Sequence, residues 1–145
     1  MNFHTLPLKE GYRMQNNVKK FSLEFVAGFL CSIVAYLPIS IICAFVLQTD
    51  NFSMVLIALF SAYPLGSIVG VLLIERLFFK VIGWKIAAIG IAIASGLVGG
   101  YLGLVMLENF QNISILFIQM IITGLVLVAY NISSLFNIKS VIRFD

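Results

Sequence analysis

Four long runs of apolar residues, separated by short polar segments, are the dominant pattern along the chain. The runs cover residues 25–47, 52–74, 86–107 and 113–137, and none of them contains Asp, Glu, Lys or Arg. A helix needs about 20 apolar residues to cross the hydrocarbon core of a bilayer, which is roughly 30 Å thick. The pattern therefore predicts an all-α, polytopic integral membrane protein with four transmembrane helices.

Two prolines lie inside the predicted spans, Pro38 in the first and Pro64 in the second. A proline inside a helix removes one backbone hydrogen bond and crowds the preceding turn, so we expect both spans to be kinked. Freed carbonyl groups line binding sites in some transporters, and static bends of the same kind are equally common in membrane helices.

The composition leads to the same class of protein. Of the 145 residues, 61% are hydrophobic and only 10% are charged, and the mean hydropathy is +1.10. An ordinary soluble domain has about a quarter charged residues. We divide the chain into a polar leader over residues 1–20, one transmembrane domain over 21–138 and a short tail over 139–145, which leaves no room for a separate catalytic or sensory module.

All nine basic residues fall on one side of this predicted arrangement. They are Lys9, Arg13, Lys19, Lys20, Arg76, Lys80, Lys85, Lys139 and Arg143. Because cytoplasmic flanks hold an excess of Lys and Arg, both termini and the connection over 75–85 are predicted to be cytoplasmic, with the turns over 48–51 and 108–112 outside. This basic ring suits the anionic headgroups of the bilayer as a partner, and nothing implies nucleic acid.

Small residues recur at every fourth position in the second and third spans, a spacing that favours close helix packing. The two rows are Ala58, Ala62, Gly66 and Gly70, and Ala88, Ala92, Gly96 and Gly100. We expect an antiparallel pair in which 58 meets 100, 62 meets 96, 66 meets 92 and 70 meets 88, with Val71 facing lipid. A second row, Ser95, Gly99 and Gly103, either packs inside the chain or contacts another subunit.

Polar residues gather on one face of the first span and on one face of the fourth. The main candidates are Ser32, Tyr36 and Ser40 in the first span and Gln119, Thr123 and Tyr130 in the fourth. Unpaired hydroxyl and amide groups are costly in hydrocarbon, so both faces are expected to turn away from lipid. They either hydrogen-bond to each other inside the bundle, or line a narrow polar path or grip a partner's helix.

Four charged residues lie at the cytoplasmic ends of the spans: Lys20, Glu24, Glu75 and Arg76. We expect them to gather near the cytoplasmic interface. One interpretation is a solvated or locally paired interfacial cluster. The other is a gating or coupling role for Glu24, the acidic residue closest to hydrocarbon in the first helix.

The chain lacks the residue groupings that enzymes use. Its only histidine, His4, is in the leader, the spans contain no acidic pair, and there is no phosphate-binding loop. No group of His, Cys and carboxylate residues has metal-ligand spacing. We therefore expect no catalytic, cofactor-binding or metal site.

These features predict a non-enzymatic integral membrane subunit or scaffold that packs with other membrane subunits or with itself. The alternative is a small homo-oligomeric transporter or channel for a small solute or ion. Its path would be lined by Ser32, Tyr36, Gln119 and Thr123.

Overall fold

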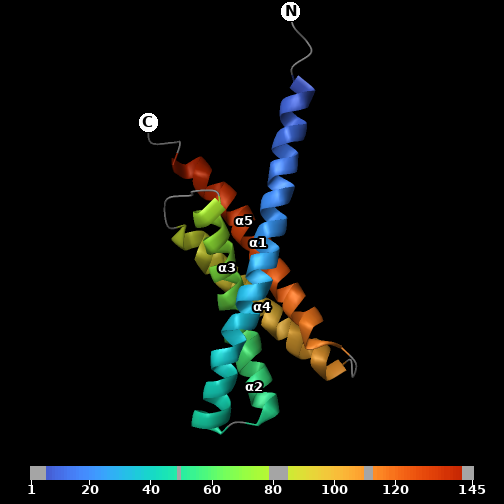
Figure 1. Cartoon of the computed structure of the whole chain (residues 1–145), viewed down its shortest axis with the longest axis vertical. Coiled ribbons are helices and arrows are strands. Elements are labelled where there is room, and N and C mark those ends of the chain that lie inside the picture. The colour runs from blue at the N-terminus through green and yellow to red at the C-terminus, as the bar shows by residue number, and fades with distance from the viewer. Residues whose placement is uncertain (1–5, 49, 79–84, 110–112, 142–145) are drawn as a thin grey trace, which may run out of the picture.

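The computed structural model describes residues 6–48, 50–78, 85–109 and 113–141, with side chains described between residues 16 and 135 of these ranges. Every described element is a helix: α1 (Leu6–Ile42), α2 (Asn51–Ile57), α3 (Tyr63–Phe78), α4 (Ile86–Asn109) and α5 (Ile115–Val141) (Figure 1). A π-helical segment extends α1 over Cys43–Leu47, and a second one joins α2 to α3 over Ala58–Ala62.

Four helical stretches are long and apolar enough to cross a membrane, as the sequence predicts. They are Asn16–Leu47, Asn51–Phe78, Ile86–Asn109 and Ile115–Leu135. The start of α1, the end of α3, the start of α4 and the end of α5 lie at one end of the bundle (Figure 1). We call this the basic end, because Lys20, Arg76 and Lys85 belong to these helix ends.

Helix α1 begins well before the first predicted span, at Leu6. Pro7 falls in its first turn, where a missing N–H leaves no hydrogen bond unmade. The leader that follows contains Lys, Glu, Met and Gln, which are good helix formers, so the helix continues from the leader into the apolar run. Residues 1–5 of the leader and 142–145 of the tail lie outside the described residues.

Irregular helix geometry lies close to both prolines. Pro64 directly follows the first residue of α3, and the π-helical segment Ala58–Ala62 ends just before it, with the Tyr63 N–H donating to the Ala58 carbonyl. A π-bulge of this kind changes the direction of a helix. Helix α1 continues for four residues past Pro38 before its own π-helical extension begins, and the left-handed residue Gln48 (φ 49°) ends that extension.

The most extensive helix contact is that between α1 and α3, and two glycines of α3 make it possible. A Cβ atom on Gly66 would lie 2.4 Å from the Cα atom of Ser32, and one on Gly70 would lie 2.5 Å from the carbonyl carbon of Ala27. Both neighbours are backbone atoms of α1. The expectation that these glycines face Ala92 and Ala88 of α4 is therefore wrong, because α1 occupies this face of α3.

The other half of the small-residue pattern does meet α4. A Cβ atom on Gly96 would lie 2.7 Å from the Pro64 side chain, and one on Gly100 would lie 2.8 Å from the carbonyl oxygen of Leu59. These contacts are within two residues of the expected register. The four alanines of the two rows, Ala58, Ala62, Ala88 and Ala92, are all in the hydrophobic core. Val71, expected to face lipid, is also in the core, with 1% of its surface exposed.

The second row of small residues on α4 packs against α5. The atoms closest to a Cβ on Gly99 belong to Leu125 and Ile122, and a Cβ on Gly103 would lie 2.5 Å from the Ile118 side chain. This face of α4 is therefore filled by the chain's own last helix, and the interpretation of it as a contact surface for another subunit is wrong.

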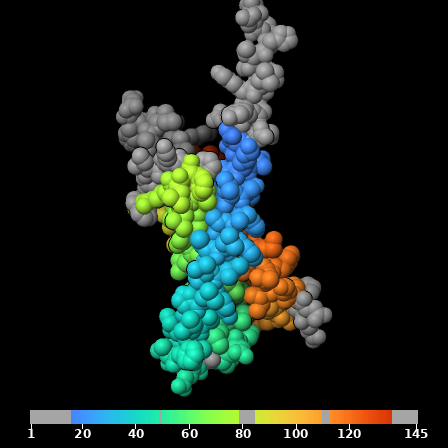
Figure 2. Space-filling view, in the orientation of Figure 1, coloured from blue at the N-terminus to red at the C-terminus, as the bar shows by residue number. Residues whose placement is uncertain are grey.

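Apolar side chains cover much of the outward surface of the helices. Examples are Val34 and Phe45 of the first stretch, Val69 of α3 and Leu116 of α5, each at least half exposed. Figure 2 shows one face of the bundle, on which α1 runs between the end of α3 and the start of α5. A surface of this kind fits a hydrocarbon environment or contact with other apolar helices.

Candidate functional site: a buried charged cluster

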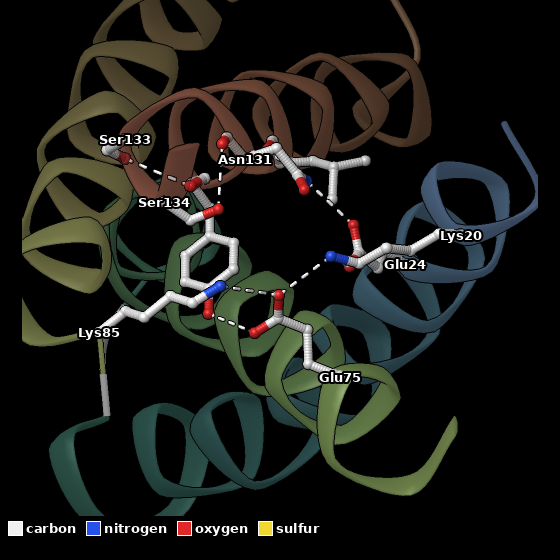
Figure 3. Close-up of polar contacts among 9 residues, drawn as sticks. Lys20, Glu24, Glu75, Lys85, Asn131, Ser133 and Ser134 are labelled. Atoms are coloured by element: carbon white, nitrogen blue, oxygen red, sulfur yellow. Dashed lines mark hydrogen bonds and ion pairs between the residues drawn. The ribbon is translucent and has the colours of Figure 1, made fainter. Parts of the chain in front are cut away.

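Glu75 of α3 is the centre of a polar network at the basic end of the bundle (Figure 3). Its Oε1 atom lies 3.1 Å from the Lys20 ammonium and 3.4 Å from the Lys85 ammonium. Its Oε2 atom accepts a hydrogen bond of 2.6 Å from the Tyr130 hydroxyl. Only 3% of Glu75 is exposed, so this carboxylate exchanges its water shell for three protein donors.

Glu24 of α1 lies beside it and is completely buried. Its Oε2 atom accepts a hydrogen bond of 2.9 Å from the Asn131 side-chain amide, which also donates to the Leu127 carbonyl. Its Oε1 atom lies 3.3 Å from the Lys20 ammonium, yet it is buried and accepts no hydrogen bond. The Lys20 ammonium therefore lies between the two carboxylates (Figure 3).

Residues of three membrane-length stretches and one residue directly before the third stretch meet at this network. Lys20 and Glu24 are four residues apart, which places them on the same face of α1. The other residues come from α3, from the position just before α4, and from α5. We call the group the charged cluster: Lys20, Glu24, Glu75, Lys85, Tyr130 and Asn131.

The cluster balances two carboxylates with two ammonium groups. An unpaired buried charge is very costly, whereas a paired and hydrogen-bonded one is tolerated. The side chains of Lys20 and Lys85 are 24% and 19% exposed, so both ammonium groups reach inward from the rim of the bundle. The Lys85 ammonium also lies 5.8 Å from the centre of the Tyr130 ring, within cation–π range.

The sequence predicts only part of this cluster. Lys20, Glu24 and Glu75 do come together, and both carboxylates are buried rather than solvated. Arg76 is exposed, because it follows Glu75 by about 100° around α3. Lys85 and Asn131 are not among the residues that the sequence predicts for this cluster. An amide inside an apolar run and a lysine at the start of one are the signals that point to them, since each needs a partner in hydrocarbon.

The polar faces of α1 and α5 meet each other inside the bundle. The Gln119 amide donates hydrogen bonds of 2.5 Å to the Ser32 hydroxyl and 3.2 Å to the Phe29 carbonyl. The Thr123 hydroxyl is 3.0 Å from that of Ser67 on α3, a residue absent from the expected set. The bond between Gln119 and Ser32 joins the two predicted faces, whereas Thr123 bonds to a third helix, α3.

The remaining candidates on these faces lie apart from one another. The Tyr36 ring is 6.0 Å from the Tyr63 ring, centre to centre. The Ser40 hydroxyl donates to the Leu37 carbonyl of its own helix, and Tyr130 belongs to the charged cluster. The six polar residues predicted to lie on these two faces are thus distributed over several separate contacts.

The residues that the structure describes contain no group of three His, Cys, Asp or Glu side chains placed to hold a metal ion. A groove on the outer side of α3 is lined by Val69, Leu72, Leu73 and Arg76. Comparison of the chain with protein-family models, with curated proteins and with solved structures gave no match. Function is therefore inferred from the chemistry and geometry of the bundle alone.

Proposed function

We propose that this protein is a non-enzymatic integral membrane subunit or scaffold, with both termini in the cytoplasm, that packs within a larger membrane assembly. The observation that carries this proposal is the contrast between the inside and the outside of the bundle. Inside, the polar groups of different spans bond to one another; outside, the helices present apolar side chains.

A polar path through the bundle would need side chains that face a water-filled space. Two of the best candidates are instead used between helices, since Gln119 donates to Ser32 and Thr123 pairs with Ser67. Opening a path between them would break these bonds, and water in the path would have to replace them. Holding the bundle together is thus the simpler role for these groups.

The proposed orientation rests on the distribution of basic residues. Lys19, Lys20, Arg76 and Lys85 belong to the basic end of the bundle, and positive charge favours the cytoplasmic side. The side chains of the other five, Lys9, Arg13, Lys80, Lys139 and Arg143, lie outside the described residues. The same charges support contact with anionic lipid headgroups.

Cysteine labelling tests this orientation in intact cells. In a background without Cys31 and Cys43, single cysteines at positions 49 and 109 should react with a membrane-impermeant thiol reagent added outside. Cysteines at positions 16 and 82 should stay unlabelled until the membrane is permeabilised, and they serve as matched controls. The reverse pattern would overturn the orientation.

Purification in a gentle detergent, followed by measurement of the intact mass, tests the role as a subunit. We expect other polypeptides to co-purify in a fixed ratio. A homo-oligomer that carries a solute across liposome membranes would contradict the proposal and support the transporter alternative. A monomer without partners would contradict both.

One observation favours the transporter alternative, namely the complete burial of Glu24. Ionisable groups inside a membrane bundle commonly mark ion or proton pathways. Purified protein in liposomes with an imposed proton gradient separates the two functions. Uptake in the wild type and its loss in a folded Glu24→Gln variant would replace the subunit proposal.

A further inference from the structure

The two carboxylates of the charged cluster are unequally supplied with donors. Glu75 contacts two ammonium groups and one hydroxyl. Glu24 accepts one amide hydrogen bond and shares the ammonium of Lys20, which is closer to Glu75 (3.1 Å) than to Glu24 (3.3 Å). The Oε1 atom of Glu24 is a buried oxygen without a hydrogen-bond donor.

The charged and titratable groups around Glu24 come from every helix packed at this end. Lys20 lies on its own helix, Glu75 on α3, and Tyr130 on α5, where its hydroxyl is committed to Glu75. Lys85, next to α4, contacts Glu75. Of these groups, Lys20 forms an ion pair with Glu24, while the nearby charge of Glu75 opposes ionisation of Glu24.

We propose that Glu24 is a proton-binding site and that its protonation ends its ion pair with Lys20, which leaves the Lys20 ammonium paired with Glu75. A proton from the aqueous phase at the basic end adds to the buried Oε1 atom and converts the carboxylate into a carboxyl group. The net charge of the two glutamates and two lysines then changes from zero to +1. This proposal depends on the geometry of the cluster and not on the role as a subunit.

Two features of the cluster allow this step. The Lys20 ammonium keeps its hydrogen bond of 3.1 Å to the Oε1 atom of Glu75 once Glu24 is neutral. Glu75 keeps the Lys85 ammonium and the Tyr130 hydroxyl and therefore stays paired. Because Lys20 also connects α1 to Glu75 of α3, the contact between these two helices at the basic end is kept.

Infrared difference spectroscopy of the purified protein in lipid tests the proton site directly. As the pH is lowered, the wild type should gain a carbonyl stretching band of a buried, protonated carboxyl group. Glu24→Gln should abolish this band. Glu75→Gln should retain it, and so should the matched control Glu108→Gln, which replaces an exposed glutamate near the end of α4. The amide I band of each variant reports whether it is folded.

A second variant keeps the proposal testable if Glu24→Gln does not fold. Lys20→Gln leaves the carboxyl group in place and removes its ion-pair partner. The band should then develop at a pH higher by about 1 to 3 units, the usual effect of losing a close opposite charge. An unchanged midpoint would contradict the proposed link between the proton and Lys20.

Distance measurements test whether α1 stays in contact with α3 when Glu24 is protonated. Spin labels at Val18 and Phe78, both exposed near the basic end, report the separation of α1 and α3 in a background without the native cysteines. Acidification that protonates Glu24 should leave this distance unchanged in the wild type, and the distance in Glu24→Gln should be the same. Absence of a carboxyl band in folded wild type, its persistence in Glu24→Gln, or a distance that lengthens as Glu24 is protonated would each overturn the proposal.

Discussion

Replacing Gly66 by alanine should separate α1 from α3, although the change adds a single methyl group. The new Cβ atom would lie 2.4 Å from the Ser32 Cα atom, 2.8 Å from the Ser32 nitrogen and 2.9 Å from the Cys31 carbonyl oxygen. Ordinary contacts of a Cβ atom begin at 3.4 Å, so the closest approach must increase by 1.0 Å. All three neighbours are backbone atoms, which no side-chain rotation can move away.

The size of the effect follows from this geometry. Overpacking costs about 1 to 3 kcal/mol, and a backbone obstacle places Gly66→Ala near the upper limit. Alanine recovers up to about 1 kcal/mol of helix propensity, so the net loss of unfolding free energy should be about 2 kcal/mol. Gly90 of α4 is the matched control, since nothing lies within 4 Å of its added Cβ. Gly90→Ala should be neutral or stabilise by up to about 1 kcal/mol.

Steric-trap unfolding in bicelles can measure both variants under native lipid conditions. The two free energies should differ by about 3 kcal/mol, which is about a hundredfold in the equilibrium constant. If Gly66→Ala lies within about 0.5 kcal/mol of Gly90→Ala, the close crossing of α1 over α3 is wrong.

Three further predictions concern single side chains. Gln119→Leu removes the hydrogen bonds from α5 to α1 and should cost about 1 kcal/mol in the same unfolding assay, whereas exposed Met120→Leu should cost nothing measurable; equal effects would contradict this role. Tyr130→Phe removes a 2.6 Å donor from a buried carboxylate and should cost about 1.5 to 3 kcal/mol, and an unchanged stability would exclude that bond. A hydrogen bond from Ser53 lowers the pKa of Asp50. The stability that ionised Asp50 gives the start of α2 is therefore present above the ordinary pKa of an aspartate, and it is lost as the pH falls through the lowered pKa of Asp50. Carboxyl NMR should show the pKa of Asp50 returning toward its usual value in Ser53→Ala, and an identical titration would refute this cause.

The sequence predicts which segments are membrane-length helices, because the length of an apolar run is a local property. It does not predict which neighbour a helix face contacts. The spacing of Gly66 and Gly70 indicates a small-residue face on the second span, yet this spacing is equally compatible with α1 and with α4. The choice of α1 depends on helix tilt and crossing angle, which only the assembled bundle defines.

The charged cluster shows the same division between local and non-local information. That Lys20, Glu24 and Glu75 lie at span ends follows from the sequence alone. Their burial does not, because it requires Lys85 and Asn131 to arrive from two other helices. Lys85 is 10 positions from Glu75, whereas the other contacts between helices join residues 55 to 107 positions apart, and no local pattern encodes such a meeting.

The order of synthesis gives the charged cluster a consequence for assembly in the cell. Glu24 enters with the first helix, when Lys20 is the only member of the cluster already made. Glu75 and Lys85 follow with the middle of the chain, and the amide of Asn131 arrives with the last helix. Until then, α1 carries a glutamate that hydrocarbon does not solvate, so the membrane-insertion machinery or the lipid headgroup region has to hold this end of α1. The last helix thus completes the bundle, and chains truncated before it should be preferred substrates for membrane quality-control proteases.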